Sequence, residues 1–542
     1  MCQAGNGEMN FNAIARRLTA LVERLVTLLA SPKHSQRAVI GILIAYTVVW
    51  TTYAIVAKTT QGIHADMGEI ASWGWDLEWG THKHPPFLPA LVSVWFSVFP
   101  RSDWAYYLLA VISTSVAIYF TWLLSGFWLQ GAKRAAVPLL LMLIPFYNFL
   151  ALKLDHNTIL VPLWAITTYA FVKSFETRST LWSVVTGIFA GFAVLAKYWS
   201  FFLLLGLASA ALADRERLRY LKSSAPWIIT LLSFGLFLPH IVWLETNNYP
   251  TFLAAQHRHA VSSVDFLWHL WGYVGNSIAY IAAPLIAVAV LALPSRRALV
   301  DILFPHDRIR RFAAVMFWVP VLAAIPFAVV MQTNLSALWT MSALSLLGVV
   351  LLSSPLIQFT RKSAVVVASL AIIVSVGALL ASPLVAVGKL WGGVENHANY
   401  TKSLAKEVQS QWDQTTAHPL RTVQSVFTLA NSVTFYLENK VLPVMFYART
   451  RPQWDTAETI DKFGTAMICP EANVACRSTM DGLAAGRVVA RHVVVKIQPH
   501  WLGFFGEPQS FVIDIVPPRI RGQAEDEYCC VSGARRGKFS RE

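Results

Sequence analysis

The chain has 542 residues, 55% of them hydrophobic and 14% charged, and its mean hydropathy is +0.50. Soluble domains usually carry about 25% charged residues, so this composition excludes a disordered protein and argues against an ordinary soluble enzyme. The net charge is +14. Much of that excess lies in short segments between apolar runs, which membrane topology explains better than nucleic-acid binding, and we expect no nucleic-acid partner.

A basic N-terminal segment, residues 1–37, precedes the first strongly apolar run. It contains a weakly amphipathic stretch, residues 11–29, with Arg16, Arg17 and Arg24. This stretch is expected either to lie on the membrane surface or to act as a basic tail that fixes orientation. Because it holds no short apolar stretch ending in a small-residue cleavage site, the apolar run that follows is expected to remain as a membrane anchor.

Long runs rich in Ile, Val, Leu and Phe predict an all-α polytopic membrane protein, since the strands of a bilayer barrel alternate in polarity. We expect about eleven transmembrane helices. They are placed at residues 38–57, 104–128, 136–152, 158–172, 181–196, 198–213, 225–244, 270–293, 312–331, 335–352 and 363–387.

The charges between these runs predict the orientation. With the N-terminus in the cytoplasm, the strongly basic short loops all become cytoplasmic, as the usual excess of Lys and Arg on that side requires. These loops are residues 133–134, 173–178, 215–222, 296–311 and 361–362. An odd number of crossings then places the chain after residue 388 outside.

Composition changes after residue 388, where polar and charged residues return. We expect a small α+β domain over 389–542, with a helix near 405–412 and strands near 488–497 and 511–516. The transmembrane domain would occupy 38–388. Cys469 and Cys476 could form one local disulfide if this C-terminal part is extracytoplasmic.

The first outside loop, residues 64–87, is unusually rich in His, Asp, Glu and Trp. Asp66 and Glu69 are three residues apart, so a helix would place both carboxylates on one face. Pro85 and Pro86 are expected to start a new helical segment. The alternative reading is that these carboxylates and Trp residues are only solvated anchors at the interface.

Three further polar groups interrupt the apolar background on the same side. Asp155, in an Asp-His-Asn turn, either reaches water from a helix end or belongs to a site at the membrane surface. Lys197 runs against the positive-inside bias, which favours a phosphate-binding role over simple exposure to water. In the loop 256–259, Arg258 could grip a phosphate and a neutral His257 could ligate a metal.

Carboxylates and cations on one side of a membrane suit glycosyl transfer from a lipid phosphate. An acid can orient or deprotonate the acceptor, and cations can neutralise charge on the departing phosphate. The sequence contains no nucleotide-binding glycine loop after a strand and no nucleophilic serine elbow.

In order and topology, residues 38–390 resemble the GT-C glycosyltransferases of the protein O-mannosyltransferase and aminoarabinose (lipid A) transferase type. Asp66 corresponds to the early Asp of that family, and residues 73–80 correspond to its aromatic stretch. The other correspondences are His84-Pro85-Pro86 for the Pro-Pro turn, Asp155 for the second-loop Asp, Lys197 behind Gly187 and Gly191, and His257 and Arg258 for the later His and Arg.

The chain departs from this pattern at three positions. Met67 stands where the family has a second acid, and Glu69 can take its place from the next turn. Lys83 stands where the aminoarabinose branch has an acid associated with a metal, and His84 replaces a Lys. A divalent metal therefore stays an open question, with His82, His84 and His257 as candidate ligands.

The resemblance implies an inverting transferase in the bacterial inner (plasma) membrane, with a periplasmic C-terminal domain. The donor would be a polyprenyl-phosphate sugar, and the acceptor a lipid or cell-surface glycan such as lipid A or lipopolysaccharide core. Asp66 and Asp155 would be catalytic. The substrate-binding residues would be Glu69, His84, Lys197, His257 and Arg258.

The alternatives are a transporter or lipid flippase, a protein O-mannosyltransferase, and a non-catalytic scaffold. Transporters place charged residues within helices near the midplane, often with repeat symmetry. Here the polar residues gather in outside loops and no repeat is visible. The sequence leaves open the sugar, the acceptor, the exact number of helices and the oligomeric state.

Overall fold

The computed structural model describes residues 5–75, 77–252, 263–392, 397–446 and 457–519. Its contacts divide the chain into two compact units, which we describe separately. The first unit contains residues 1–57 and 77–383, and the second contains 58–76 and 384–542. The domain boundaries drawn from composition, 1–37, 38–388 and 389–542, stay a prediction.

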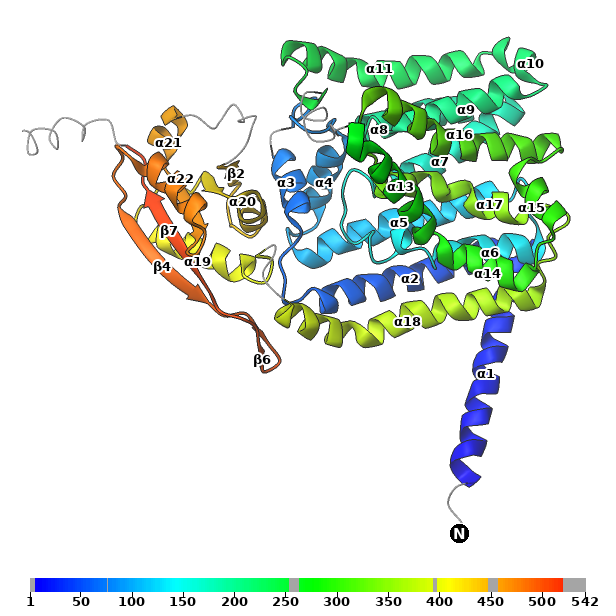
Figure 1. The fold of residues 1–542 in the computed structure, drawn as a ribbon, viewed down its shortest axis with the longest axis horizontal. Helices are drawn as coiled ribbons and strands as arrows, with labels where there is room; N and C mark the ends of the chain where they lie inside the picture. The colour runs from blue at the N-terminus through cyan, green and yellow to red at the C-terminus, as the bar shows by residue number, and fades with distance from the viewer. Residues whose placement is uncertain (1–4, 76, 253–262, 393–396, 447–456, 520–542) are drawn as a thin grey trace, which may run out of the picture. The chain divides into compact units, whose positions relative to one another are not determined.

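The first unit is built almost entirely of helices (Figure 1). They are α1 (Gly5–Ala30), α2 (Ser35–Ala57), α4 (Phe87–Val98), α5 (Asp103–Ser125), α6 (Gly131–Leu141), α7 (Leu160–Thr177), α8 (Thr180–Ala196), α9 (Ser200–Ala213), α10 (Arg217–Leu221), α11 (Ala225–Thr246), α13 (Ser263–Tyr280), α14 (Ala282–Ala292), α15 (Arg296–Leu303), α16 (Arg308–Met331), α17 (Leu347–Leu352) and α18 (Arg361–Trp391), which continues into the second unit. Two 3₁₀ segments, Pro145–Tyr147 and Ala337–Leu346, accompany them. Helix α8 packs against α7 and α11, and α5 packs against α2 and α7.

Each predicted apolar run overlaps one or more of these helical segments, and three runs differ in detail. The run at 136–152 remains α-helical only to Leu141, and the run at 335–352 is a 3₁₀ helix followed by the short α17. The run at 270–293 bends by 55° between α13 and α14. Within the described residues, α2, α5, α11, α16 and α18 are long and apolar enough to cross a membrane, and the bent pair adds a sixth if it is one span.

The helices of the first unit bury some of their large apolar side chains and leave others exposed. Trp50 and Trp164 are each 1% exposed, whereas Ile44 on α2 and Leu231 on α11 are exposed by 62% and 72%. Apolar surface of this extent is not stable in water, and it matches the side chains that face lipid in a bilayer. The chain is therefore a multi-pass membrane protein.

The second unit contains a five-stranded mixed sheet in the order β2-β1-β3-β7-β4. Its strands are β1 (Thr422–Ser425), β2 (Leu442–Met445), β3 (Thr465–Pro470), β4 (Arg491–Ile497) and β7 (Gln509–Val516), and a small hairpin is formed by β5 (His500–Trp501) and β6 (Phe504–Phe505). Strand β1 is parallel to β2 and β3, whereas β7 is antiparallel to β3 and β4. Its helices are α3 (Ala65–Trp73), α19 (Thr401–Asp413), α20 (Phe427–Phe435), α21 (Ala457–Phe463) and α22 (Val474–Ala484).

Both faces of this sheet are covered by helices. Along β7, Phe511 and Ile513 join a core with residues of α19 and α20, while Val512 and Val516 join a core with residues of α21 and α22. The alternation follows from the two-residue period of a strand. The predicted α+β character, helix and two strands are therefore confirmed by α19, β4 and β7.

The predicted disulfide is present. Cys469 on β3 and Cys476 on α22 are bonded, with their Cα atoms 5.7 Å apart, and both side chains are fully buried. The bond links the sheet to the helix that covers it.

Helix α3 comes from the predicted first outside loop, yet it packs within the second unit. Gly68 lies so close to α20 that a Cβ atom there would be 2.2 Å from the carbonyl oxygen of Asn431. The Ile63 amide donates to the Tyr436 hydroxyl at 2.7 Å, and the Gly62 amide donates to the Ala398 carbonyl at 2.8 Å. Close backbone approach therefore requires glycine at position 68.

Candidate active site

The turn before α4 is closed by a single threonine. The Thr81 hydroxyl accepts hydrogen bonds from the amides of Lys83 at 3.2 Å and His84 at 3.0 Å, and it donates to the His84 carbonyl at 2.9 Å. Pro86 then directly precedes α4 as its N-cap residue, as the Pro-Pro pair predicted. The turn fixes the backbone of His84, whose side chain is half-buried.

The Asp155 carboxylate organises the turn that leads into α7. Its Oδ1 accepts the amides of Asn157 at 2.8 Å and Thr158 at 3.0 Å, and the Asp155 amide donates to the Thr158 hydroxyl at 2.7 Å. This reciprocal arrangement has the logic of a helix capping box. The other oxygen, Oδ2, is 3.8 Å from the Lys153 amine. Asp155 therefore orients this turn through one oxygen and faces a cation with the other.

Lys197 ends α8 and points back to the same turn. Its Nζ donates to Asn157 Oδ1 at 2.5 Å and lies 4.5 Å from the ring centroid of Trp339. Burial lowers the pKa of this amine to about 8, an effect that the nearby Asp155 carboxylate partly opposes. The ammonium form is costly to bury, so a ligand phosphate that pairs with it would recover favourable interaction energy.

His156 joins this turn to His84. The two imidazole rings are stacked, with centroids 3.9 Å apart and planes inclined by 26°. His156 Nδ1 lies 2.9 Å from the Ala196 carbonyl, which can only accept, so Nδ1 carries a proton and in the neutral ring Nε2 is the basic nitrogen. His84, Asp155 and Lys197 are thus connected through the two residues that follow Asp155.

A second set of contacts holds the segment before Thr81 against α11. His240, fully buried in α11, bonds through Nδ1 to the Trp79 carbonyl and through Nε2 to the Tyr198 hydroxyl, the latter at 2.6 Å. The Trp243 indole donates to Glu78 at 3.0 Å. Gly80 is required here because a Cβ atom would lie 2.3 Å from the Trp243 ring.

The remaining predicted carboxylates lie in the second unit. Asp66 is in the first turn of α3 and its side chain is 34% exposed, while Glu69 is 4% exposed. His64 caps this helix: its Nδ1 accepts from the Asp66 amide at 3.1 Å and lies 3.7 Å from Asp66 Oδ2. Both carboxylates therefore lie on one helix, and they differ strongly in exposure.

The remaining predicted site residues are His257, Arg258 and His82. His257 and Arg258 lie outside the described residues. His82 is half-buried in the turn closed by Thr81. Among the residues described, no three His, Cys, Asp or Glu side chains come together as metal ligands. We therefore derive no step through a metal.

Sequence reasoning did not assign roles to His240, Trp339 or Asn157. A lone His in an apolar helix is a detectable signal, because a polar side chain there needs a partner. Trp339 carries no such signal, since a Trp within an apolar run is ordinary core composition.

Parts of the sequence are similar to known glycosyltransferases. Residues 83–243, which include His84, Asp155 and Lys197, match the family model of dolichyl-phosphate-mannose-protein mannosyltransferases. The chain is 25% identical over 266 residues to the lipopolysaccharide core galacturonosyltransferase RgtB of Rhizobium johnstonii. That match covers 47% of this chain and 52% of RgtB, so the chain spans about half the length of that curated relative.

The fold is similar to that of a solved membrane protein. The crystal structure of ArnT from Cupriavidus metallidurans bound to undecaprenyl phosphate matches with a TM-score of 0.54 and 15% sequence identity. The match covers 88% of this chain and 97% of the ArnT chain.

Proposed function

We propose that this chain is a GT-C glycosyltransferase of the ArnT and protein mannosyltransferase type, which it resembles in sequence and fold, and that it transfers a sugar from a polyprenyl phosphate to a lipid or cell-surface glycan. The observation that carries the proposal is the half-buried Lys197, which lies within the family-matched range and whose amine is held by Asn157 and Trp339. The lipopolysaccharide core specificity in the name of RgtB supports lipid A or lipopolysaccharide core as the acceptor class. The undecaprenyl phosphate bound to ArnT supports the donor class.

The proposed reaction is an in-line displacement that inverts the anomeric carbon. An acceptor oxygen forms a bond to that carbon while the bond from the carbon to the phosphate oxygen breaks. Polyprenyl phosphate leaves with the electron pair and gains one negative charge. If the acceptor is a hydroxyl, its proton passes to the Asp66 carboxylate. If the acceptor is itself a phosphate, no strong base is needed and Asp66 acts by positioning.

The cations stabilise the leaving phosphate. Lys197, Arg258 and His84 are proposed to hold this phosphate. Because the negative charge of the phosphate increases during the transfer, a positive group stabilises the transition state more than the ground state. Asp155 is proposed to orient the sugar or the acceptor, in keeping with its bonds to the turn. Glu69 and His257 are proposed to contact substrate.

Binding of the phosphate should depend on the protonation of Lys197. Burial lowers its pKa to about 8, and only the ammonium form pairs with an anion. We expect affinity for polyprenyl phosphate to be full below pH 8 and to fall as the pH rises through it. Lys197→Arg keeps its charge throughout this range, so it should remove the fall. Equilibrium binding measured well below and well above pH 8 tests this, and an identical pH profile in the two proteins would contradict it.

We also propose about eleven spans, a cytoplasmic N-terminus and a periplasmic C-terminal domain. The basic short loops and the disulfide between Cys469 and Cys476 support this topology. A phosphatase fused to the C-terminus should be active, and a fluorescent protein that folds only in the cytoplasm should be dark. The opposite pair of results would reverse the orientation. Free thiols at both cysteines in protein isolated without reductant would argue against the disulfide alone.

One experiment tests the function as a whole. Mass spectrometry should find a glycolipid in the parent strain that loses one sugar in a deletion strain, and the mass difference names the sugar. The family model also favours a second candidate, a protein O-mannosyltransferase, for which the lost mass would be found on proteins instead. Transfer by the purified chain from donor to acceptor separates both from a lipid transporter, which would move lipid without forming a glycosidic bond.

A further inference from the structure

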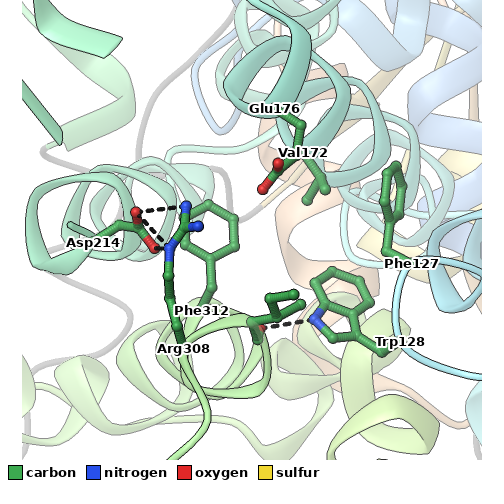
Figure 2. A pocket seen from close by; sticks show the side chains of 8 residues that line it. Phe127, Trp128, Val172, Glu176, Asp214, Arg308 and Phe312 are labelled. Atoms are coloured by element: carbon green, nitrogen blue, oxygen red, sulfur yellow. Dashed lines mark hydrogen bonds and ion pairs between the residues drawn. The ribbon is translucent and has the colours of Figure 1, made fainter. Parts of the chain in front are cut away.

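A pocket of about 320 Å³ lies where several helices of the first unit end, and the proposed reaction does not use it (Figure 2). Phe127 and Trp128 follow α5, Glu176 is in the last turn of α7, and Arg308 and Phe312 begin α16. Helix α7 starts beside the Asp155 turn, so its rise of 1.5 Å per residue separates the pocket from that turn by about 25 Å. The two sites are therefore at opposite ends of the same helix.

Of the two carboxylates that line the pocket, one forms an ion pair within the described residues and the other does not. Asp214 is paired by the Arg308 guanidinium, with Nε 2.9 Å from Oδ2 and Nη2 2.8 Å from Oδ1. Glu176 is exposed, and no cation among the described residues forms an ion pair with its carboxylate. Figure 2 shows that this carboxylate points into the space bordered by Phe312 and Trp128. The lining thus has one carboxylate available to a ligand.

Aromatic rings surround that carboxylate. The Trp128 indole donates to the Ile309 carbonyl at 2.8 Å, which fixes its ring, and Phe312 is only 6% exposed. The Lys173 ammonium lies 5.4 Å from the Phe127 ring centroid, so one of these rings already carries a cation. Aromatic faces beside a carboxylate attract organic ammonium groups through cation–π interaction and charge.

Two cations lie near this carboxylate. Arg308 leaves 35% of its side chain exposed, and Lys173, whose amine lies near the Phe127 ring, is half-buried. The apolar side chain of Ile309, which lines the pocket, is 52% exposed. A ligand that fits all three features has an ammonium group for Glu176, an adjacent phosphate for Arg308 and Lys173, and a hydrocarbon chain for the exposed apolar surface.

We propose that this pocket binds the aminoethyl-phosphate headgroup of a phosphatidylethanolamine molecule from the surrounding bilayer. The ammonium group contacts Glu176 and the ring of Trp128, the phosphate faces Arg308 and Lys173, and an acyl chain runs along Ile309. A phospholipid without an amine offers no cation to the Glu176 carboxylate. Binding is therefore selective for the amine.

The test is native mass spectrometry of the delipidated full chain with phosphatidylethanolamine or phosphatidylglycerol added. The parent should bind the ethanolamine lipid about tenfold more tightly, and Glu176→Gln should abolish that preference. Glu216→Gln is the matched control: it removes the same charge at the same end of the helices, from an acid paired with Arg178 outside the pocket. The control should keep the preference.

Three results would overturn the proposal. Equal binding of the two lipids by the parent would remove the selectivity. A preference that survives Glu176→Gln would place the amine elsewhere. Free phosphoethanolamine that binds as tightly as the lipid would identify a soluble headgroup compound, and not a bilayer lipid, as the ligand.

Discussion

Lys197→Met is expected to lower the rate of sugar transfer by about a hundredfold or more, because it removes a poorly screened positive charge from the departing phosphate. The phosphate gains charge as the bond breaks, so the loss should appear in turnover as well as in donor affinity. Binding of polyprenyl phosphate, the product that keeps this group, should weaken. Binding of the acceptor alone should change little. Arg258→Met is expected to behave in the same way.

Two control variants show whether the loss is due to the positive charge at position 197. Lys197→Arg retains the charge and should keep a large part of the activity. Lys133→Met removes a half-buried lysine whose Nζ bonds to the Ser354 carbonyl at 2.8 Å, at the end of the helices that carries the basic loops. It should leave transfer unchanged. If Lys197→Met binds polyprenyl phosphate like the parent and fails only when acceptor is added, the residue belongs to the acceptor side.

Asp66→Asn is expected to abolish transfer while expression and thermal stability stay near those of the parent. Asparagine has almost the same shape but cannot take a proton, and the Asp66 side chain is 34% exposed, so the charge contributes little to folding. Activity assays of the purified variant, with its melting temperature as a check on folding, measure both. Near-normal transfer would exclude Asp66 from catalysis.

Asp103→Asn is the matched control for that variant. Asp103 occupies the first turn of α5, as Asp66 occupies the first turn of α3, so both changes remove the same favourable interaction with a helix N-terminus. Only the change at Asp66 should stop transfer. Asp155→Asn should have an intermediate effect, since an amide oxygen can still accept the two backbone amides that bond to Asp155 Oδ1.

The helical architecture could be predicted because hydropathy alone reports which segments avoid water. Hydropathy could not predict whether each of those segments forms a straight α-helix, a bent helix or a 3₁₀ helix. The run at 335–352 is mostly a 3₁₀ helix and the run at 270–293 is bent, and both shapes depend on packing against neighbours that the sequence does not identify. The β7 strand was predictable because it is a short apolar run, and its residues alternate between two buried faces of the sheet.

Part of the candidate site was predictable because charged residues stand out against apolar sequence. Asp155 and Lys197 stand out as charges at the ends of apolar runs, and the structure links them through Asn157. The link itself depends on how α7 and α8 pack, and the ring of Trp339 reaches Lys197 from a distant segment. No spacing in the sequence reports contacts between segments this far apart.

The fit of α3 against α20 restricts how this protein could be re-engineered by exchanging parts with a relative. Gly68 and the Asn431 carbonyl meet without room for one additional carbon atom, so the two segments have to be matched to each other. A chimera that receives only a foreign C-terminal portion would combine a native α3 with a foreign partner helix. A graft that carries residues 58–76 together with residues 384–542 would transplant a compatible pair, and with it the carboxylate of Asp66.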